Sequence, residues 1–210
     1  MNTRTRIKHA VKYLFLLLAL PLFALYRLFS LAGSRDSVFQ SFSQFLSLVP
    51  GKVGVYLRGA FYRLACTDTS DDTCIGFLVL FSHQDTTLGK GVYIGPGCNV
   101  GKCSIGANTL LGSGVHVLSG NRQHHFTNPE LPIKEQGGHF EKISIGSDCW
   151  LGNNAVIMVS LADKTLVAAG SVVTRPAEPG AILAGNPARV IGNRLKKDEA
   201  TATEGDTHDQ

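Results

Sequence analysis

An apolar residue recurs at intervals of about six positions between residues 75 and 173, and a glycine directly follows it eight times. Such a period leaves room for two or three strand residues and a corner, which is too short for an ordinary strand and turn. Three such segments close a coil of about 18 residues, and stacked coils form parallel strands around one apolar core. We therefore predict a mainly β fold, a parallel β-helix, with one apolar side chain of each segment pointing inward. The recurring residues are Ile75, Phe81, Leu88, Ile94, Val100, Ile105, Leu111, Val117, Ile145, Leu151, Ile157, Leu161, Val167 and Val173.

The composition agrees with this prediction. The 210 residues include 23 glycines and only 17% charged residues, which argues against a helical bundle and for a turn-rich β architecture. A hydrophobic content of 44% excludes disorder for most of the chain. The formal net charge is +4, and the Lys and Arg residues are scattered, so we expect no nucleic acid among the partners.

The positive charge is concentrated near the N-terminus. Residues 1–66 contain nine Lys and Arg side chains but a single acid, Asp36. A basic, apolar segment joined to a mildly acidic globular part suggests that residues 1–66 contact a membrane surface. We expect residues 1–33 to form the membrane-associating segment and residues 34–74 to form amphipathic helices.

An uncharged apolar run extends from Tyr13 to Tyr26, and Pro21 in its middle would kink or break a helix. A helix of this length measures about 21 Å, whereas the hydrocarbon core of a bilayer is about 30 Å thick. Basic residues lie on both sides of the run, and the positive-inside rule would draw both ends to the cytoplasm. A cleaved signal peptide, a single span and an interfacial or re-entrant helix all remain open.

Two further segments show helical spacing of apolar residues. The first covers residues 36–49, and the second covers residues 53–64, where we expect Arg58 and Arg63 to lie off the apolar face. A basic amphipathic helix often lies on an anionic membrane. The alternative is that both helices cap the core of the following domain.

Five cysteines occur in the chain, and no two of them have the C-x-x-C spacing. This pattern provides neither a zinc ribbon nor a redox motif. Buried, reduced thiols are the expected state. The cysteines are Cys66, Cys74, Cys98, Cys103 and Cys149.

The repeat is interrupted once, by the polar segment 119–142, which carries three of the seven histidines. Long loops that project from a rigid repeat tend to carry function. An imidazole can accept the proton of a hydroxyl nucleophile near neutral pH. The sequence therefore places its candidate general base in this loop.

Three stretches resemble the hexapeptide-repeat acyltransferases, which fold as a left-handed parallel β-helix. They are CWLGNNAVIM at 149–158, VAAGSVVTRP at 167–176 and AGNPARVIG at 184–192. The resemblance is strongest to O-acetyltransferases of exopolysaccharide and colanic acid biosynthesis and extends to maltose and galactoside acetyltransferases. It covers residues 75–192, with 119–142 as an inserted loop. We expect residues 193–210 to form a disordered polar tail.

The resemblance also implies the general base. The stretch His124-His125-Phe126-Thr127-Asn128-Pro129 is similar to the His-x-aromatic-x-Asp-Pro stretch of the family, which aligns His124 with the base. His125 is the main rival for this role. Asn128 departs from the family pattern, which often has Asp at that position.

The donor implied by the resemblance is acetyl-CoA, bound between two neighbouring β-helices of a homotrimer, and no metal is required. The residues that carry over to its site are Asn153, Ala169, Thr174, Arg175 and Arg189. The two arginines suit the phosphates of CoA. Where relatives have a second basic residue this chain has Gly192, with Arg194 close by.

We therefore expect an acetyl-CoA-dependent O-acetyltransferase that acts on a saccharide hydroxyl, in exopolysaccharide or surface polysaccharide biosynthesis. An acceptor linked to lipid would place the enzyme at the cytoplasmic face of the bacterial inner membrane. A zinc enzyme of the gamma carbonic anhydrase type would need three histidine ligands, for which His83, His116 and His124 are the candidates. A non-catalytic β-solenoid scaffold and a serine acetyltransferase are further alternatives.

Overall fold

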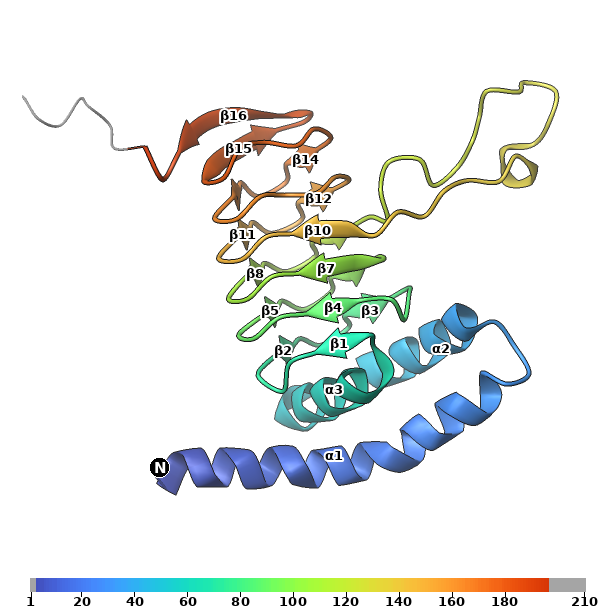
Figure 1. Ribbon diagram of the computed structural model, residues 1–210, viewed down its shortest axis with the longest axis vertical. Coiled ribbons are helices and arrows are strands. Elements are labelled where there is room, and N and C mark those ends of the chain that lie inside the picture. Colours follow the sequence, from blue (N-terminus) through green and yellow to red (C-terminus); the bar gives the residue numbers. More distant parts are fainter. Residues whose placement is uncertain (1–2, 197–210) are drawn as a thin grey trace, which may run out of the picture.

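The computed structural model describes residues 3–196, and three helices precede a stack of short parallel strands (Figure 1). The helices are α1 (Thr3–Phe29), α2 (Arg35–Ser47) and α3 (Gly51–Ala65). Three parallel sheets form the faces of the stack, which is a β-solenoid. The mainly β parallel helix predicted from the repeat is thus confirmed.

The three sheets are called faces A, B and C, and from β1 to β12 successive strands belong to these faces in the order A, B, C. Face A consists of β1 (Asp68–Thr69), β4 (Thr87–Leu88), β7 (Cys103–Ile105) and β10 (Ile143–Ile145). Face B consists of β2 (Cys74–Ile75), β5 (Tyr93–Ile94), β8 (Leu110–Leu111), β11 (Trp150–Leu151), β13 (Leu166–Val167), β15 (Ala181–Gly185) and β16 (Ala188–Asn193). Face C consists of β3 (Leu80–Phe81), β6 (Asn99–Val100), β9 (His116–Val117), β12 (Val156–Ile157) and β14 (Val172–Val173).

The register keeps the repeat in phase from coil to coil. Ile94 pairs with both Ile75 and Leu111, and all three side chains are fully buried. After β12 the chain makes a shorter corner, and face A is reduced to a parallel bridge between Ile145 and Leu161. The coil nevertheless continues into β13. Each segment buries one apolar side chain, and these side chains stack in columns along the solenoid. Burial therefore explains why the apolar residues recur with a fixed period in the sequence.

The two shorter helices close the first coil of the solenoid (Figure 1). Their inward residues are fully buried, as in Phe39 and Leu46 of α2 and Phe61 of α3. The buried Ser43 hydroxyl accepts hydrogen bonds from the hydroxyl of Tyr62 and from the backbone N–H of Phe81, both at 2.8 Å. The helices therefore cap the solenoid core, the second of the two alternatives that the sequence left open.

The expectation that Arg58 lies away from the packed face was wrong. Arg58 is fully buried, and its guanidinium donates hydrogen bonds to the backbone oxygens of Val49 (2.7 Å), Leu46 (3.1 Å) and Ile75 (3.1 Å). The first two acceptors lie at the C-terminal end of α2, where a helix leaves carbonyl groups without partners. Arg58 thus ties α2, α3 and the first coil together.

Helix α1 is continuous through Pro21 and bends along its length instead of breaking (Figure 1). One stripe of the helix packs on α3 and the solenoid and includes the fully buried Ala19 and Tyr26. Phe15 stacks on Tyr56 of α3 with ring centroids 5.3 Å apart. By length and composition alone, residues 5–29 could cross a membrane, yet one stripe of the helix is packed against the domain.

The solenoid begins at Asp68, before the predicted boundary at residue 75, and ends in an antiparallel hairpin of β15 and β16. Most of the predicted tail, residues 197–210, lies outside the described residues. All five cysteines are free, and all except Cys74 are buried. Burial raises the pKa of Cys66 and of Cys103 to about 12, so these thiols are poor nucleophiles.

Candidate active site

The inserted loop leaves the solenoid after β9 on face C and returns at β10 on face A, so it projects from the corner between these faces (Figure 1). Backbone hydrogen bonds join its two arms. Glu141 donates to Ser119 (2.9 Å), and His139 donates to Arg122 (2.9 Å). Further out, the N–H of His125 donates to the oxygen of Gly137 at 3.0 Å. These bonds hold the candidate base on a defined stem.

The tip of the loop is closed by one glutamine side chain. Gln136 accepts a hydrogen bond from the N–H of Asn128 (3.0 Å) and donates to the backbone oxygens of Asn128 and Leu131, both at 2.8 Å. The side-chain oxygen of Asn128 accepts a bond from the N–H of Glu130. Asn128 therefore shapes the turn in this chain, and its side chain is committed to the backbone.

His124 lies exposed on one arm of the loop, beside Phe140 on the other arm. The two rings meet edge to face with centroids 6.4 Å apart. On the solenoid, His83 packs against the same phenylalanine at 5.4 Å, and its Nδ1 lies 2.9 Å from the hydroxyl of Ser82. Phe140 is thus the contact that relates the candidate base to the solenoid corner below it.

A cluster of opposite charges holds the base of the loop. Lys142 donates a 2.6 Å hydrogen bond to Asp85, and Lys102 lies 3.4 Å from the other carboxylate oxygen. The hydrogen bond from Lys142 is the main reason that the pKa of Asp85 is held below its ordinary value. Asp85 is therefore engaged in fixing the returning arm of the loop.

Asp148 lies at the corner between faces A and B, away from the corner that carries the His124 loop. There its carboxylate is 3.5 Å from Arg194 and 3.8 Å from Lys164. Glu141 lies at the foot of the loop, next to Gly120. A Cβ atom at position 120 would come within 2.9 Å of the Cβ of Glu141. The contact that the structure gives to the His124 ring is thus aromatic.

The residues expected to hold the donor lie on the last coils of the solenoid, at three places. Asn153 and Ala169 follow β11 and β13 and are stacked at the corner between faces B and C, where Gly170 donates a 2.8 Å bond to the oxygen of Asn153. Thr174 and Arg175 follow β14 and lie at the corner between faces C and A, the corner that carries the His124 loop. Face C separates the two groups. Arg189 lies at the start of β16 in the terminal hairpin.

The two candidate phosphate ligands fit a negatively charged group. Arg175 and Arg189 are both exposed, and within the described part of the chain neither forms an ion pair. One nitrogen of the Arg189 guanidinium donates to the backbone oxygens of Ala188 (3.1 Å) and Pro187 (3.5 Å), which leaves the other nitrogens available to a ligand within the described part of the chain. Arg194 is different, because it is paired with Asp148.

Sequence reasoning gave little weight to the outer side of face C. Asn99 on β6 and His116 on β9 are in register there, and both are exposed. The signal that could have located them is their position directly before an inward apolar residue. Within residues 3–196, no three His, Cys, Asp or Glu side chains are placed to hold a metal ion. The histidines named for a zinc enzyme therefore form no such cluster.

A parallel β-solenoid with a histidine-bearing loop at one corner is the class that fold and site define. Two family models match the chain: Bacterial transferase hexapeptide (six repeats) over residues 85–119, and Hexapeptide repeat of succinyl-transferase over residues 142–175. The two matches lie on either side of the inserted loop. Hexapeptide repeats thus match on both sides of this loop, and the resemblance stated from the motifs is confirmed.

Curated relatives are named acetyltransferases. A chloramphenicol acetyltransferase of Agrobacterium fabrum is 30% identical over 122 residues, which are 50% of this chain and 58% of the relative. The putative colanic acid biosynthesis acetyltransferase WcaF of Escherichia coli K12 is 30% identical over 118 residues, which are 52% of this chain and 59% of the relative. The chain thus spans somewhat more than half the length of these relatives.

Solved structures share the fold. A hexapeptide-repeat acetyltransferase from Vibrio cholerae, complexed with acetyl-coenzyme A, superimposes with a TM-score of 0.64 at 20% identity. The match covers 79% of this chain and 92% of the neighbour. At this identity the likeness establishes the architecture.

Proposed function

We propose that the protein is an acetyltransferase that moves the acetyl group of acetyl-CoA to a hydroxyl of a saccharide, with His124 as general base. The observation that carries the proposal is the projecting loop, which presents His124 at the same corner of the solenoid as Thr174 and Arg175. The named activities of the relatives support the reaction class, and the complex of a structural neighbour with acetyl-CoA supports the donor.

The chemistry follows from what each group can do. His124 accepts the proton of the sugar hydroxyl as the oxygen attacks the thioester carbonyl, a step of general base catalysis that contributes typically about 10²–10⁴-fold. Backbone N–H groups stabilise the oxyanion that develops on the carbonyl. The thiolate of CoA then leaves and takes the proton from the imidazolium. Arg175 and Arg189 hold CoA phosphates.

The proposed site needs more than one copy of the chain. In a single chain His124 is exposed, and the loop that carries it projects from the solenoid (Figure 1). A homotrimer, proposed from the family resemblance, would set this loop against the face of a neighbouring solenoid and exclude water from the reacting atoms.

We also propose that α1 lies in the surface of the cytoplasmic membrane, where a lipid-linked saccharide would be the acceptor. Away from its packed stripe, α1 exposes Leu14, Leu17 and Leu18, which are 53–64% accessible. The docked helix presents this apolar side outward, and basic residues flank its apolar run. An amphipathic helix of this kind lies in the interface plane.

The test is thiol release from acetyl-CoA with three acceptors: lipid-linked saccharide from bacterial membranes, the same saccharide freed from lipid, and chloramphenicol. We expect saccharide-dependent release, about 10²-fold slower in His124→Ala with CoA binding retained. His125→Ala is the matched control and keeps most of its activity.

Each other outcome changes a defined part of the proposal. A larger loss in His125→Ala would move the base to that residue. Release with chloramphenicol alone would replace the saccharide by a small hydroxyl-bearing drug, as the Agrobacterium relative suggests. Equal rates with the free and the lipid-linked saccharide would remove the reason for a membrane acceptor.

A further inference from the structure

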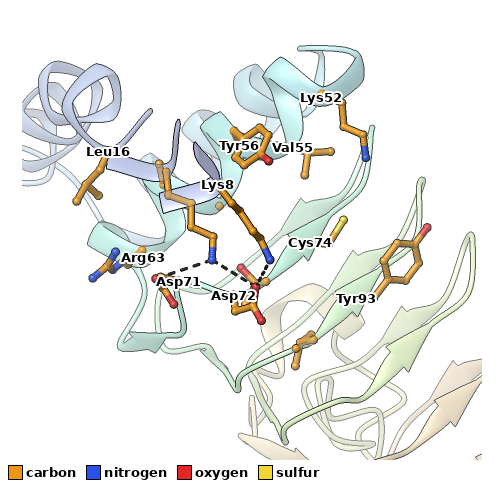
Figure 2. Close-up of a pocket in the computed structure, with 16 residues that line it drawn as sticks. Lys8, Leu16, Lys52, Val55, Tyr56, Arg63, Asp71, Asp72, Cys74 and Tyr93 are labelled. Carbon is orange, nitrogen blue, oxygen red and sulfur yellow. Dashed lines mark hydrogen bonds and ion pairs between the residues drawn. The ribbon is translucent and has the colours of Figure 1, made fainter. Parts of the chain in front are cut away.

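A cavity of about 660 Å³ lies between α1, α3 and the first two coils, at the end of the solenoid remote from the His124 loop (Figures 1 and 2). Its apolar and aromatic walls include Leu16, Val55, Tyr56, Val92 and Tyr93. The volume lies within the range of about 300–1,000 Å³ that is usual for small-molecule sites.

Four basic side chains line this cavity, against two acids. Lys8 of α1 pairs with Asp72 at 2.9 Å, and Lys12 pairs with Asp72 at 3.3 Å and with Asp71 at 3.8 Å. Both acids are thus already paired with lysines of α1. The remaining bases are Lys52 and Arg63 of α3.

Lys52 and Arg63 lie on either side of the ion-paired group (Figure 2). Both are exposed, and in the described part of the chain neither has an acid within ion-pair distance. The half-buried Cys74 stands on the cavity wall, where burial raises the pKa of its thiol and the nearby ammonium of Lys52 opposes that shift. The cavity therefore keeps two positive charges for a ligand.

The position of the cavity relative to α1 indicates which ligand it meets. Lys8 and Lys12 continue the packed stripe of α1 that contains Ala19 and Tyr26, whereas Leu14, Leu17 and Leu18 are exposed away from that stripe. A helix with its side chains is about 10–12 Å across, and an interfacial helix sinks about 5–10 Å into the boundary between headgroups and acyl chains. The opposite side of α1, and the cavity above it, would then be level with the lipid phosphates.

We infer that this cavity binds the phosphate-bearing headgroup of an anionic phospholipid. The inference rests on the membrane contact of α1 put forward under Proposed function. The ammonium of Lys52 at one end of the cavity and the guanidinium of Arg63 at the other each offer donors to phosphate oxygens, the latter with the forked geometry that suits them. The aromatic and aliphatic walls cover the glycerol backbone. Headgroup binding would set the orientation of the whole solenoid on the membrane surface.

The experiment measures binding of the full chain to vesicles of phosphatidylcholine, with and without phosphatidylglycerol. Wild type binds both kinds and binds the anionic vesicles more tightly. The double variant Lys52→Glu/Arg63→Glu loses that increment, about fivefold for each cationic residue removed, and keeps its binding to phosphatidylcholine. Both positions are exposed, so the fold is retained, which the thermal midpoint verifies.

The control variant Arg122→Glu/Lys134→Glu makes the same change of charge on the projecting loop, far from the cavity. We expect it to keep the increment. If both double variants lose the increment equally, attraction is diffuse and the cavity site is refuted. If wild type binds neither kind of vesicle, the membrane contact of α1 fails instead, and Leu14→Glu/Leu18→Glu tests that contact separately by abolishing binding to both.

A local readout comes from Cys74, since the other four cysteines are buried. Short-chain phosphatidylglycerol below its micelle concentration should slow alkylation of Cys74, as followed by intact mass, whereas short-chain phosphatidylcholine should not. Equal protection by inorganic phosphate would show a site for free anions and would overturn the assignment to lipid. No protection by any of these probes would refute headgroup binding in the cavity.

Discussion

At the scale of single residues, the loop depends on a few side chains that act through packing. His124 makes its ring contact with Phe140, which also contacts His83 on the solenoid. Phe140 itself is only half-buried, so it contributes little by burying apolar area. Its main contribution is to hold the ring of His124 in line with His83. It is a positioning residue for the proposed base.

Replacing Phe140 by Ala should lower kcat while leaving KM for acetyl-CoA unchanged. An aromatic pair contributes about 0.5–1.5 kcal/mol beyond burial, so we expect a decrease of about 2- to 10-fold. Phe140→Tyr keeps the ring and should restore the rate. Steady-state kinetics check this, and a change confined to KM would show that Phe140 serves donor binding instead.

Replacing Arg58 by Met should destabilise the fold by about 3 kcal/mol. The change keeps the volume but leaves the buried oxygens of Leu46, Val49 and Ile75 without their donor. Urea unfolding followed by circular dichroism measures it. Arg63→Met on the same helix is the control and should change stability by less than about 0.5 kcal/mol; equal losses would contradict the role given to Arg58.

At the scale of elements, α1 is held by an apolar stripe and by an ionic clamp from Lys8 and Lys12 to Asp72. The hydrogen bond from Lys8 is the largest reason that the pKa of Asp72 lies below its ordinary value, and the same bond raises the pKa of Lys8. The groups are partly exposed, so solvent screening keeps the contribution small. The clamp therefore sets where the N-terminal half of α1 lies, while the apolar stripe supplies most of the adhesion.

Acid should loosen the N-terminal half of α1 before the solenoid unfolds. Because the folded pKa of Asp72 is depressed, the clamp contributes fully above the ordinary carboxylate pKa of about 3.9 and is lost as pH falls through the folded pKa. Hydrogen exchange, corrected for intrinsic rates, should show protection of residues 8–16 decreasing in that range. Asp72→Asn should show the loosened state already at neutral pH; an unchanged pH response in that variant would exclude the clamp.

At the scale of the whole molecule, the solenoid carries an apolar column on the outside of face B. Leu110 and Trp150 are in register there; Leu110 is 47% exposed and Trp150 is 54% exposed. Aromatic side chains of this kind are enriched in interfaces between proteins. Because the proposed transfer needs a neighbouring copy of the chain, we expect face B to form the contact between copies, and a substitution on this face tests it.

We expect the protein in mild detergent to have the mass of three chains by light scattering. Trp150→Glu places a charge in the column and should shift the mass toward one chain and abolish transfer, while His124→Ala leaves the mass unchanged. A trimer that persists in Trp150→Glu would move the interface to another face. A monomer that is active as wild type would remove the need for a second copy.

The local period was sufficient to predict the solenoid because every inward residue is chosen by one condition, burial in a narrow prism. Ile75, Leu111 and Val173 lie on strands that pair only with adjacent coils, so no distant partner needs to be known. The loop at 119–142 was predictable for the same reason, as the place where the period stops. The resemblance then assigned a base and a donor site to residues that the period alone treats as ordinary corners.

What the sequence determined by itself was thus the repeat, the interruption and the histidines within it. Tertiary structure decided the rest, because it depends on which distant groups meet. It buried Arg58 against carbonyls of α2 and the first coil, packed one stripe of α1 onto the domain, and put Thr174 and Arg175 at the loop's corner while Asn153 and Ala169 lie across face C. A six-residue period specifies which side chains point inward and which point outward. The corner on which an outward residue lies depends on how many residues each coil has in its turns.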